Sequence, residues 1–297
     1  MDDRSTEKMT RLTLLGTGLM GTVVGQSLLA AGHELHIWNR TKERAASLQD
    51  NGAIFHNTPD DAIGHGDVVI LLLLNHEIAK TILRTVADRL RGKDVLDLIT
   101  STPRQVEDVA TRTRLAGGSY LAGAIQSFPD DIGTKDALIY FSGDEATWQR
   151  QQHVLRVIAP TANLLSTQAE AAAKVDAALS GAFGTTAMGA WLEALSFLAD
   201  EGFTLKSTGF RIEQWERQFA AEMALAANEV ARDDFATDQA TLAVNAAAVA
   251  SWRQTLVAGG HRADIMTAAL RTLERAVDAG HGGDSWAAQA RVLRRRD

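Results

Sequence analysis

A glycine-rich segment directly after a short apolar run has the spacing of a dinucleotide-binding loop. Its residues are Gly16, Thr17, Gly18, Leu19, Met20 and Gly21. In a GxGxxG pattern the first glycine permits a tight turn, the second lets the backbone approach a pyrophosphate, and the third allows close packing of a helix on a strand. The pattern is informative here because a strand-like run precedes it and a helical pattern follows it. We expect a pyrophosphate to bind the free N–H groups at the start of that helix.

The residues about twenty positions after this loop predict which dinucleotide binds. An NAD-specific site usually carries Asp or Glu there, which accepts hydrogen bonds from the ribose hydroxyls and would repel a 2′-phosphate. This chain instead has the run Asn39, Arg40, Thr41 and Lys42. The Arg40 guanidinium can pair with a phosphate and stack on adenine, and Thr41 adds a hydroxyl donor. Basic residues at a helix start also favour a bound anion. The sequence therefore predicts NADP(H) as the cofactor.

The elements that must position this loop alternate between short apolar runs and helix-length segments. Strand-like runs occupy residues 12–15, 34–38, 68–74, 95–99, 121–125 and 138–141. Continuous apolar runs without alternation are typical of strands buried on both faces of a parallel sheet. Helical crossovers between such strands build βαβ units. We predict an α/β fold with an N-terminal doubly wound Rossmann sheet.

The pattern changes near Pro160, the last proline of the chain. No strand signal is found beyond it. Residues 168–200 are rich in alanine and predict one long helix, and helical periodicity returns over 212–231, 242–257 and 265–279. We predict a nucleotide-binding domain over 1–163. A long crossover helix would join it to an all-helical domain over 164–297.

The composition disfavours or excludes several classes of function and of binding site. The formal net charge of −7 disfavours a general role in binding nucleic acid or an anionic membrane. There is no cysteine, which excludes disulfides and thiolate metal sites and fits a reducing cytoplasm. The N-terminus lacks a signal-peptide pattern, and the longest apolar run, 68–74, is too short to span a bilayer. His261 and His281 have no partners at metal-ligand spacing, so we predict no metal.

Further motifs carry a resemblance to a known family. They are WNRT at 38–41, VLDLITSTP at 95–103, GAI at 123–125 followed by Pro129 and Ile132-Gly133, DAAL at 176–179 and AGHG at 279–282. In these motifs the chain resembles the imine reductase and reductive aminase family, a branch of the β-hydroxyacid dehydrogenase-like superfamily. The resemblance implies hydride transfer from NADPH to a cyclic imine or iminium ion, giving an amine. It also implies a homodimer that exchanges C-terminal helices, with each active site formed by two subunits.

Two residues on the predicted long helix compete for the catalytic role. Asp176 matches the family's catalytic Asp and lies among apolar neighbours, where a carboxylic acid can donate a proton or stabilise a cation. Lys174 lies where hydroxyacid dehydrogenases of the superfamily carry a catalytic lysine, but their glycines and following Asn are absent. Residues two apart point in different directions around a helix, so both cannot face one nicotinamide. The pattern favours Asp176.

Four further positions bear on the substrate. Many family members have a Tyr that would fall on Gly184, so that hydroxyl is missing here. Asp97 stands where the family commonly has Asn; it could favour cationic iminium substrates or cap the strand end. Trp215 and Asn245 match positions that line the substrate site in relatives, although Trp215 could equally be core.

Three hypotheses follow from these residues. The first is an NADPH-dependent imine reductase. The second is a β-hydroxyacid-type dehydrogenase that uses Lys174. The third is a catalytically idle NADP-binding protein, for which the absent Tyr at Gly184 is the best argument.

Overall fold

The computed structural model describes residues 9–204, 206 and 212–294. The chain divides into two compact units, and the boundary between them falls after Phe183. Among the described residues, no helix has the length and apolar character needed to cross a membrane.

The first unit is built on one sheet in the order β3-β2-β1-β4-β5-β6-β7-β8. The strands are β1 (Arg11–Leu15), β2 (Glu34–Trp38), β3 (Ile54–Phe55), β4 (Val68–Leu71), β5 (Asp94–Asp97), β6 (Ser119–Ile125), β7 (Ile139–Gly143) and β8 (Leu164–Ser166). The first six strands are parallel, and β1 lies between β2 and β4. The strand order reverses at β1, which is where ligands bind in open α/β sheets.

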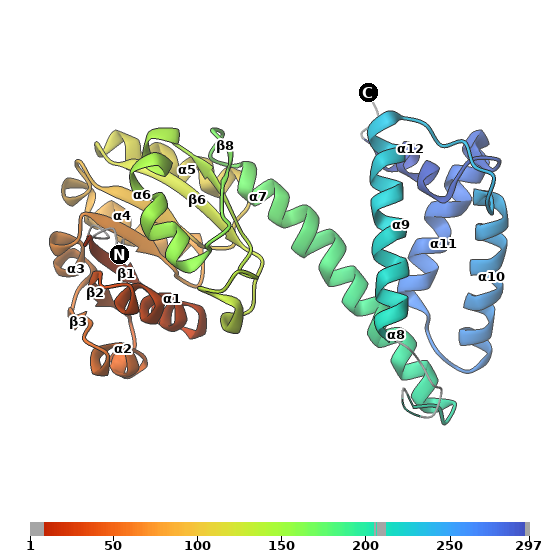
Figure 1. Ribbon diagram of the computed structural model, residues 1–297, viewed down its shortest axis with the longest axis horizontal. Coiled ribbons are helices and arrows are strands. Elements are labelled where there is room, and N and C mark those ends of the chain that lie inside the picture. The colour runs from red at the N-terminus through yellow and green to blue at the C-terminus, as the bar shows by residue number, and fades with distance from the viewer. Residues whose placement is uncertain (1–8, 205, 207–211, 295–297) are drawn as a thin grey trace, which may run out of the picture. The chain divides into compact units, whose positions relative to one another are not determined.

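Helices cover both faces of this sheet (Figure 1). One face packs against α1 (Leu19–Ala30), α2 (Ala46–Asp50) and α6 (Glu145–Ile158) around a core that includes Leu14, Leu28 and Ile37. The other face packs against α3 (Pro59–His65), α4 (His76–Thr85), α5 (Pro103–Leu115) and α7 (Ala171–Asp176), with Leu71 and Val109 in its core. Burial on both faces explains why β4 is an unbroken apolar run and why three of the five residues of β1 are leucine. The predicted doubly wound Rossmann sheet is confirmed.

Three details of the sheet differ from the prediction. The strand β7 is antiparallel to β6, so the sheet is mixed. β8 pairs with β7 after Pro160, where no strand was expected. β3 was also not predicted. Strands of two and three residues are too short to produce a recognisable pattern, and the direction of β7 depends on its connection to β6.

The segment predicted as one long helix is helical from Ala171 to Asp200 but not uniformly so. It consists of α7, the π-helix η4 (Ala177–Thr185) and α8 (Thr186–Asp200). A π-helical stretch widens the helix by one residue per turn and is often found at functional sites. Here it begins directly after Asp176 and contains Gly184.

The second unit is helical. It contains α8, α9 (Ile212–Arg232), α10 (Leu242–Ala258), α11 (Asp264–Ala276) with the π-turn η5 (Val277–His281), and α12 (Ala290–Leu293). Its core brings α10 and α11 together through Leu242, Val249, Leu270 and Leu273. The predicted all-helical C-terminal architecture is confirmed. Short 3-10 turns complete the chain: η1 (Lys42–Ala45), η2 (Ala87–Arg89), η3 (Pro129–Asp131) and η6 (Trp286–Gln289).

Candidate active site

The glycine-rich loop joins β1 to α1 where the strand order reverses. Gly16 has a φ of +107°, and a Cβ on it would lie 2.2 Å from the Leu72 carbonyl oxygen. A Cβ on Gly21 would lie 2.1 Å from the Gly16 carbonyl oxygen. Both positions therefore require glycine for the loop to close against β4 and α1. Gly18 differs, since its ideal Cβ has no atom within 4 Å. Its space is open.

The start of α1 offers unpaired donors to a ligand. Gly18 is the N-cap, no side chain caps this end, and the first turn contains no acidic residue. Leu19 is exposed and Met20 half-buried beside it. A helix N-terminus with free N–H groups and no carboxylate favours a bound anion. These residues fit the pyrophosphate of a dinucleotide.

Asn39 connects this loop to the residues after β2. Its Oδ1 accepts a hydrogen bond from the Thr17 backbone N–H at 3.2 Å, and its Nδ2 donates to the Thr41 carbonyl oxygen at 2.8 Å. Arg40, Thr41 and Lys42 are exposed, and the Lys42 ammonium lies 5.4 Å from the centre of the Phe55 ring. Within the described ranges no ion pair involves Arg40. Its charge is available to an anionic ligand.

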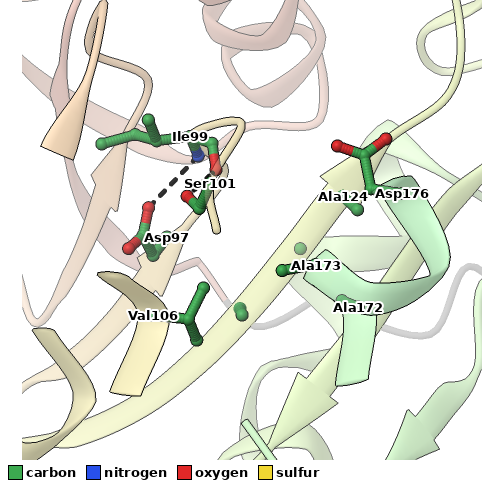
Figure 2. Close-up of a pocket in the computed structure, with 10 residues that line it drawn as sticks. Asp97, Ile99, Ser101, Val106, Ala124, Ala172, Ala173 and Asp176 are labelled. Atoms are coloured by element: carbon green, nitrogen blue, oxygen red, sulfur yellow. Dashed lines mark hydrogen bonds between the residues drawn. The ribbon is translucent and has the colours of Figure 1, made fainter. Parts of the chain in front are cut away.

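A small cavity lies at the carboxyl ends of β5 and β6, against α7 (Figure 2). Asp176, Asp97, Ser101 and small residues such as Gly123 and Ala173 line it. Figure 2 shows Asp176 on the last turn of α7, across the cavity from Asp97. The Gln126 side chain donates a hydrogen bond from Nε2 to Asp176 Oδ1 at 3.4 Å. A half-buried acid beside a sheet end is placed to exchange a proton or stabilise a cation.

Lys174 and Asp176 point in different directions, as the helix spacing predicts. The Lys174 ammonium is exposed and forms an ion pair of 2.9 Å with Glu170. This pair lowers the pKa of Glu170 through the hydrogen bond from Lys174. Lys174 does not line the cavity, whereas Asp176 does.

Asp97 lies in a buried polar network. Its Oδ1 accepts a hydrogen bond from the Ile99 N–H at 3.1 Å, its Oδ2 accepts one from the Tyr120 hydroxyl at 2.8 Å, and His76 Nε2 lies 3.0 Å from Oδ2. Burial raises the pKa of Tyr120 well above its ordinary value, and the nearby Asp97 charge adds to this rise. Ser101 Oγ lies 2.8 Å from His76 Nε2. Both Asp97 oxygens already have partners within the protein, which supports the prediction that Asp97 caps the end of β5.

The other two predicted substrate residues belong to the second unit. Trp215 is half-exposed on α9, and its ring stacks on Phe219 at 5.1 Å and on Trp191 at 6.3 Å between ring centres. Asn245 on α10 donates from Nδ2 to the carbonyl oxygens of Ala240 and Thr241. Asn245 thus holds the start of its own helix.

The sequence did not predict which side chains contact the Asp176 and Asp97 carboxylates. Gln126 lies just beyond β6, and Tyr120 and His76 belong to β6 and α4. No local pattern could identify them, because each reaches its carboxylate only after distant strands and helices have packed.

A sheet of this order with a glycine loop at its reversal point defines the class of dinucleotide-binding Rossmann proteins. Residues 11–175 match the family model of the NAD binding domain of 6-phosphogluconate dehydrogenase. Residues 168–295 match the C-terminal domain of NADPH-dependent reductive aminase-like proteins. With these two domains one after the other, the chain belongs to the imine reductase and reductive aminase family.

Individual relatives match over nearly the whole chain. The NADPH-dependent reductive aminase of Aspergillus oryzae is 25% identical over 283 residues, covering 93% of this chain and 94% of its own. The imine reductase from Myxococcus stipitatus, solved with NADP+, is 28% identical with a TM-score of 0.90, covering 96% of this chain and 100% of its own. The Aspergillus terreus reductive aminase, solved with NADPH and ethyl levulinate, is 27% identical with a TM-score of 0.90 and covers 97% and 100%.

Proposed function

We propose that this chain is an NADPH-dependent reductase that transfers hydride to the C=N bond of an imine or iminium ion and releases an amine. The observation that carries this proposal is the reductive aminase-like C-terminal domain directly after a dinucleotide-binding sheet. The exposed, ion-paired Lys174 disfavours the hydroxyacid dehydrogenase alternative.

The cofactor assignment is NADP(H), which supplies the hydride when bound. Residues 16–21 would hold the pyrophosphate, because the open face of Gly18 and the uncapped start of α1 suit it. Asn39, Arg40, Thr41 and Lys42 would hold the adenosine 2′-phosphate. Arg40 can form paired hydrogen bonds to phosphate oxygens, and the neutral Asn39 does not repel them.

Asp176 is the proposed catalytic residue. As an acid it would deliver a proton to the substrate nitrogen, and as a carboxylate it would stabilise an iminium cation. The hydrogen bond from Gln126 orients its carboxyl group from the sheet side. With glycine at 184, Asp176 would act without a tyrosine hydroxyl from that position of the helix.

Asp97 would hold the end of β5 in place rather than bind the substrate, because its oxygens are already paired with Ile99, Tyr120 and His76. The exposed aromatic group of Trp215, Trp191 and Phe219 would contribute an apolar wall for a cyclic imine. The place of Asn245 in the substrate site rests on the resemblance alone.

We further propose a homodimer that exchanges C-terminal helices. Large apolar side chains are exposed on α8 and α9, among them Met188, Leu192, Met223 and Leu225. Patches of this kind mark protein interfaces. A cytoplasmic location is proposed from the absence of cysteine.

The function is tested by mixing the purified chain and NADPH with 2-methylpyrroline, and separately NADP+ with 3-hydroxy acids. The proposal predicts NADPH oxidation with the imine and no NADP+ reduction with the hydroxy acids. Activity confined to hydroxy acids would refute it. Tight NADPH binding without turnover across a broad imine panel would support the idle NADP-binding alternative.

A further inference from the structure

Three histidines and two carboxylates gather where β2, β3 and α3 meet, apart from the loop and the cavity described above. Glu34 and His36 lie on β2, and His56 follows β3 directly. Asp61 and His65 lie four residues apart on α3, which packs against β2 (Figure 1). Leu35 and Ile37 face the opposite core, so the strand alternation turns Glu34 and His36 toward α3.

The histidine rings are packed closely. His36 stacks on His65 with ring centres 4.9 Å apart, and His56 stacks on His65 at 4.8 Å. His36 and His56 are buried, whereas His65 and Asp61 are exposed. The start of α3 is fixed by Thr58, whose side chain caps the Asp61 N–H, and by Pro59 in the first turn. The cluster is therefore held by regular elements and opens to solvent on one side.

A chain of short contacts runs through four of these residues. Glu34 Oε1 lies 2.8 Å from His36 Nε2, His36 Nδ1 lies 2.9 Å from His56 Nε2, and His56 Nδ1 lies 2.8 Å from Asp61 Oδ2. Each contact needs one hydrogen. Ionised carboxylates only accept, and each neutral imidazole supplies one N–H. Two neutral rings thus supply two hydrogens for three contacts.

When the contact at the Glu34 end of this series is satisfied, the missing hydrogen falls at one defined atom, His56 Nδ1. If His36 Nε2 donates to Glu34, His36 Nδ1 must accept from His56 Nε2. The lone pair of His56 Nδ1 then faces the Asp61 carboxylate, and two acceptors at 2.8 Å can share a positive ion, which is either a third proton or a metal ion. His65 Nε2, 3.7 Å from Asp61 Oδ1, faces the same point.

Contrary to the sequence-based expectation of no metal, we propose that His56, Asp61 and His65 form a binding site for a divalent transition-metal ion of the Zn²⁺ type. Their ligand atoms all lie within 4.8 Å of one another, so small side-chain rotations bring them around one ion. Two imidazole nitrogens and one carboxylate oxygen are a ligand set that Zn²⁺ accepts, with water from the open side as the fourth ligand. Glu34 and His36 complete the arrangement, since a metal-bound histidine usually donates its other N–H to a neighbouring group that fixes its orientation.

The test measures metal binding by the full chain without a polyhistidine tag, after treatment with a chelator. Isothermal titration with Zn²⁺ should give one site per chain, and Co²⁺ should give the visible absorption of a low-symmetry site. Asp61→Asn and His65→Ala should each weaken Zn²⁺ binding by about 100-fold, because loss of a group that only orients a ligand already costs about 10–100-fold. Both substitutions are at exposed positions and should leave the chain folded.

Asp60→Asn is the matched control. Asp60 is the preceding residue on α3 and pairs with Arg89 outside the cluster, so this variant should bind Zn²⁺ like the parent. Zn²⁺ should also raise the melting temperature of the parent and of Asp60→Asn but not of His65→Ala. Failure of the parent chain to bind Zn²⁺, or equal binding by all four proteins, would overturn the proposal. Neither result depends on imine reduction.

Discussion

At the scale of single residues, the main consequence is that Lys174 and Asp176 are not equivalent. We expect Asp176→Ala to lower turnover by about 100-fold or more, which is a typical contribution of a proton donor. NADPH affinity, followed by cofactor fluorescence, should stay unchanged. Lys174→Ala is the matched control and should keep turnover near that of the parent, because its ammonium pairs with Glu170. The reverse pattern would assign the chemistry to Lys174.

Tyr120 gives a second residue-level prediction. Tyr120→Phe removes a hydrogen bond to the buried Asp97 carboxylate and should lower the free energy of unfolding by about 1.5–3 kcal/mol, measured by urea denaturation. Tyr140, the second of the two tyrosines, supplies the control Tyr140→Phe. Loss of equal size in both variants would contradict the buried bond.

The same pair of variants tests the raised pKa of Tyr120. The folded chain keeps the phenol protonated where the unfolded chain, with an ordinary pKa of about 10, loses the proton. The unfolded state then binds fewer protons, so the free energy of unfolding falls as pH rises through about 10. This component should be present in the parent and in Tyr140→Phe, and absent in Tyr120→Phe.

At the scale of elements, two glycines of the loop between β1 and α1 have different roles: Gly18 is expected to serve cofactor binding, and Gly21 is needed for folding. Gly18→Ala meets no atom within 4 Å, so the free energy of unfolding should change by less than about 1 kcal/mol. NADPH binding should weaken by about tenfold or more, since a methyl group would occupy the space beside the pyrophosphate. Gly21→Ala should instead destabilise the fold, because its Cβ would overlap the Gly16 carbonyl oxygen. Unchanged NADPH affinity in Gly18→Ala would contradict the loop assignment.

The elements also show what sequence can and cannot predict. β1, β2 and β4 were recognisable because burial on both faces makes them rich in leucine, isoleucine and valine, and α9 to α11 because their apolar residues recur with helical spacing. The π-helix η4 has no such signature, since its hydrogen bonding shifts by one residue without a change in composition. For the site, Asp176 could be proposed from the family resemblance and its apolar neighbours, whereas Gln126 and Tyr120 reach their carboxylates only through tertiary packing.

At the scale of the whole molecule, the exposed apolar residues of α8 and α9 and the proposed exchange of C-terminal helices predict a homodimer. Light scattering after size-exclusion chromatography should give twice the 32.0 kDa of one chain. Leu192→Asp and Leu225→Asp place charges on exposed apolar positions and should shift the mass toward the monomer. Since the proposed site needs both subunits, the monomer should lose activity. An active monomer would contradict the exchanged arrangement.

The central claim is hydride transfer from NADPH to a C=N carbon. The most direct measurement uses NADPH with deuterium at the transferred C4 position and 2-methylpyrroline as substrate, with mass spectrometry of the amine. The account predicts one deuterium in 2-methylpyrrolidine, bound to the former imine carbon, and formation of this product about 100-fold more slowly in Asp176→Ala. NADPH binding without any labelled amine, or label appearing only in a hydroxy acid from a keto acid substrate, would contradict it.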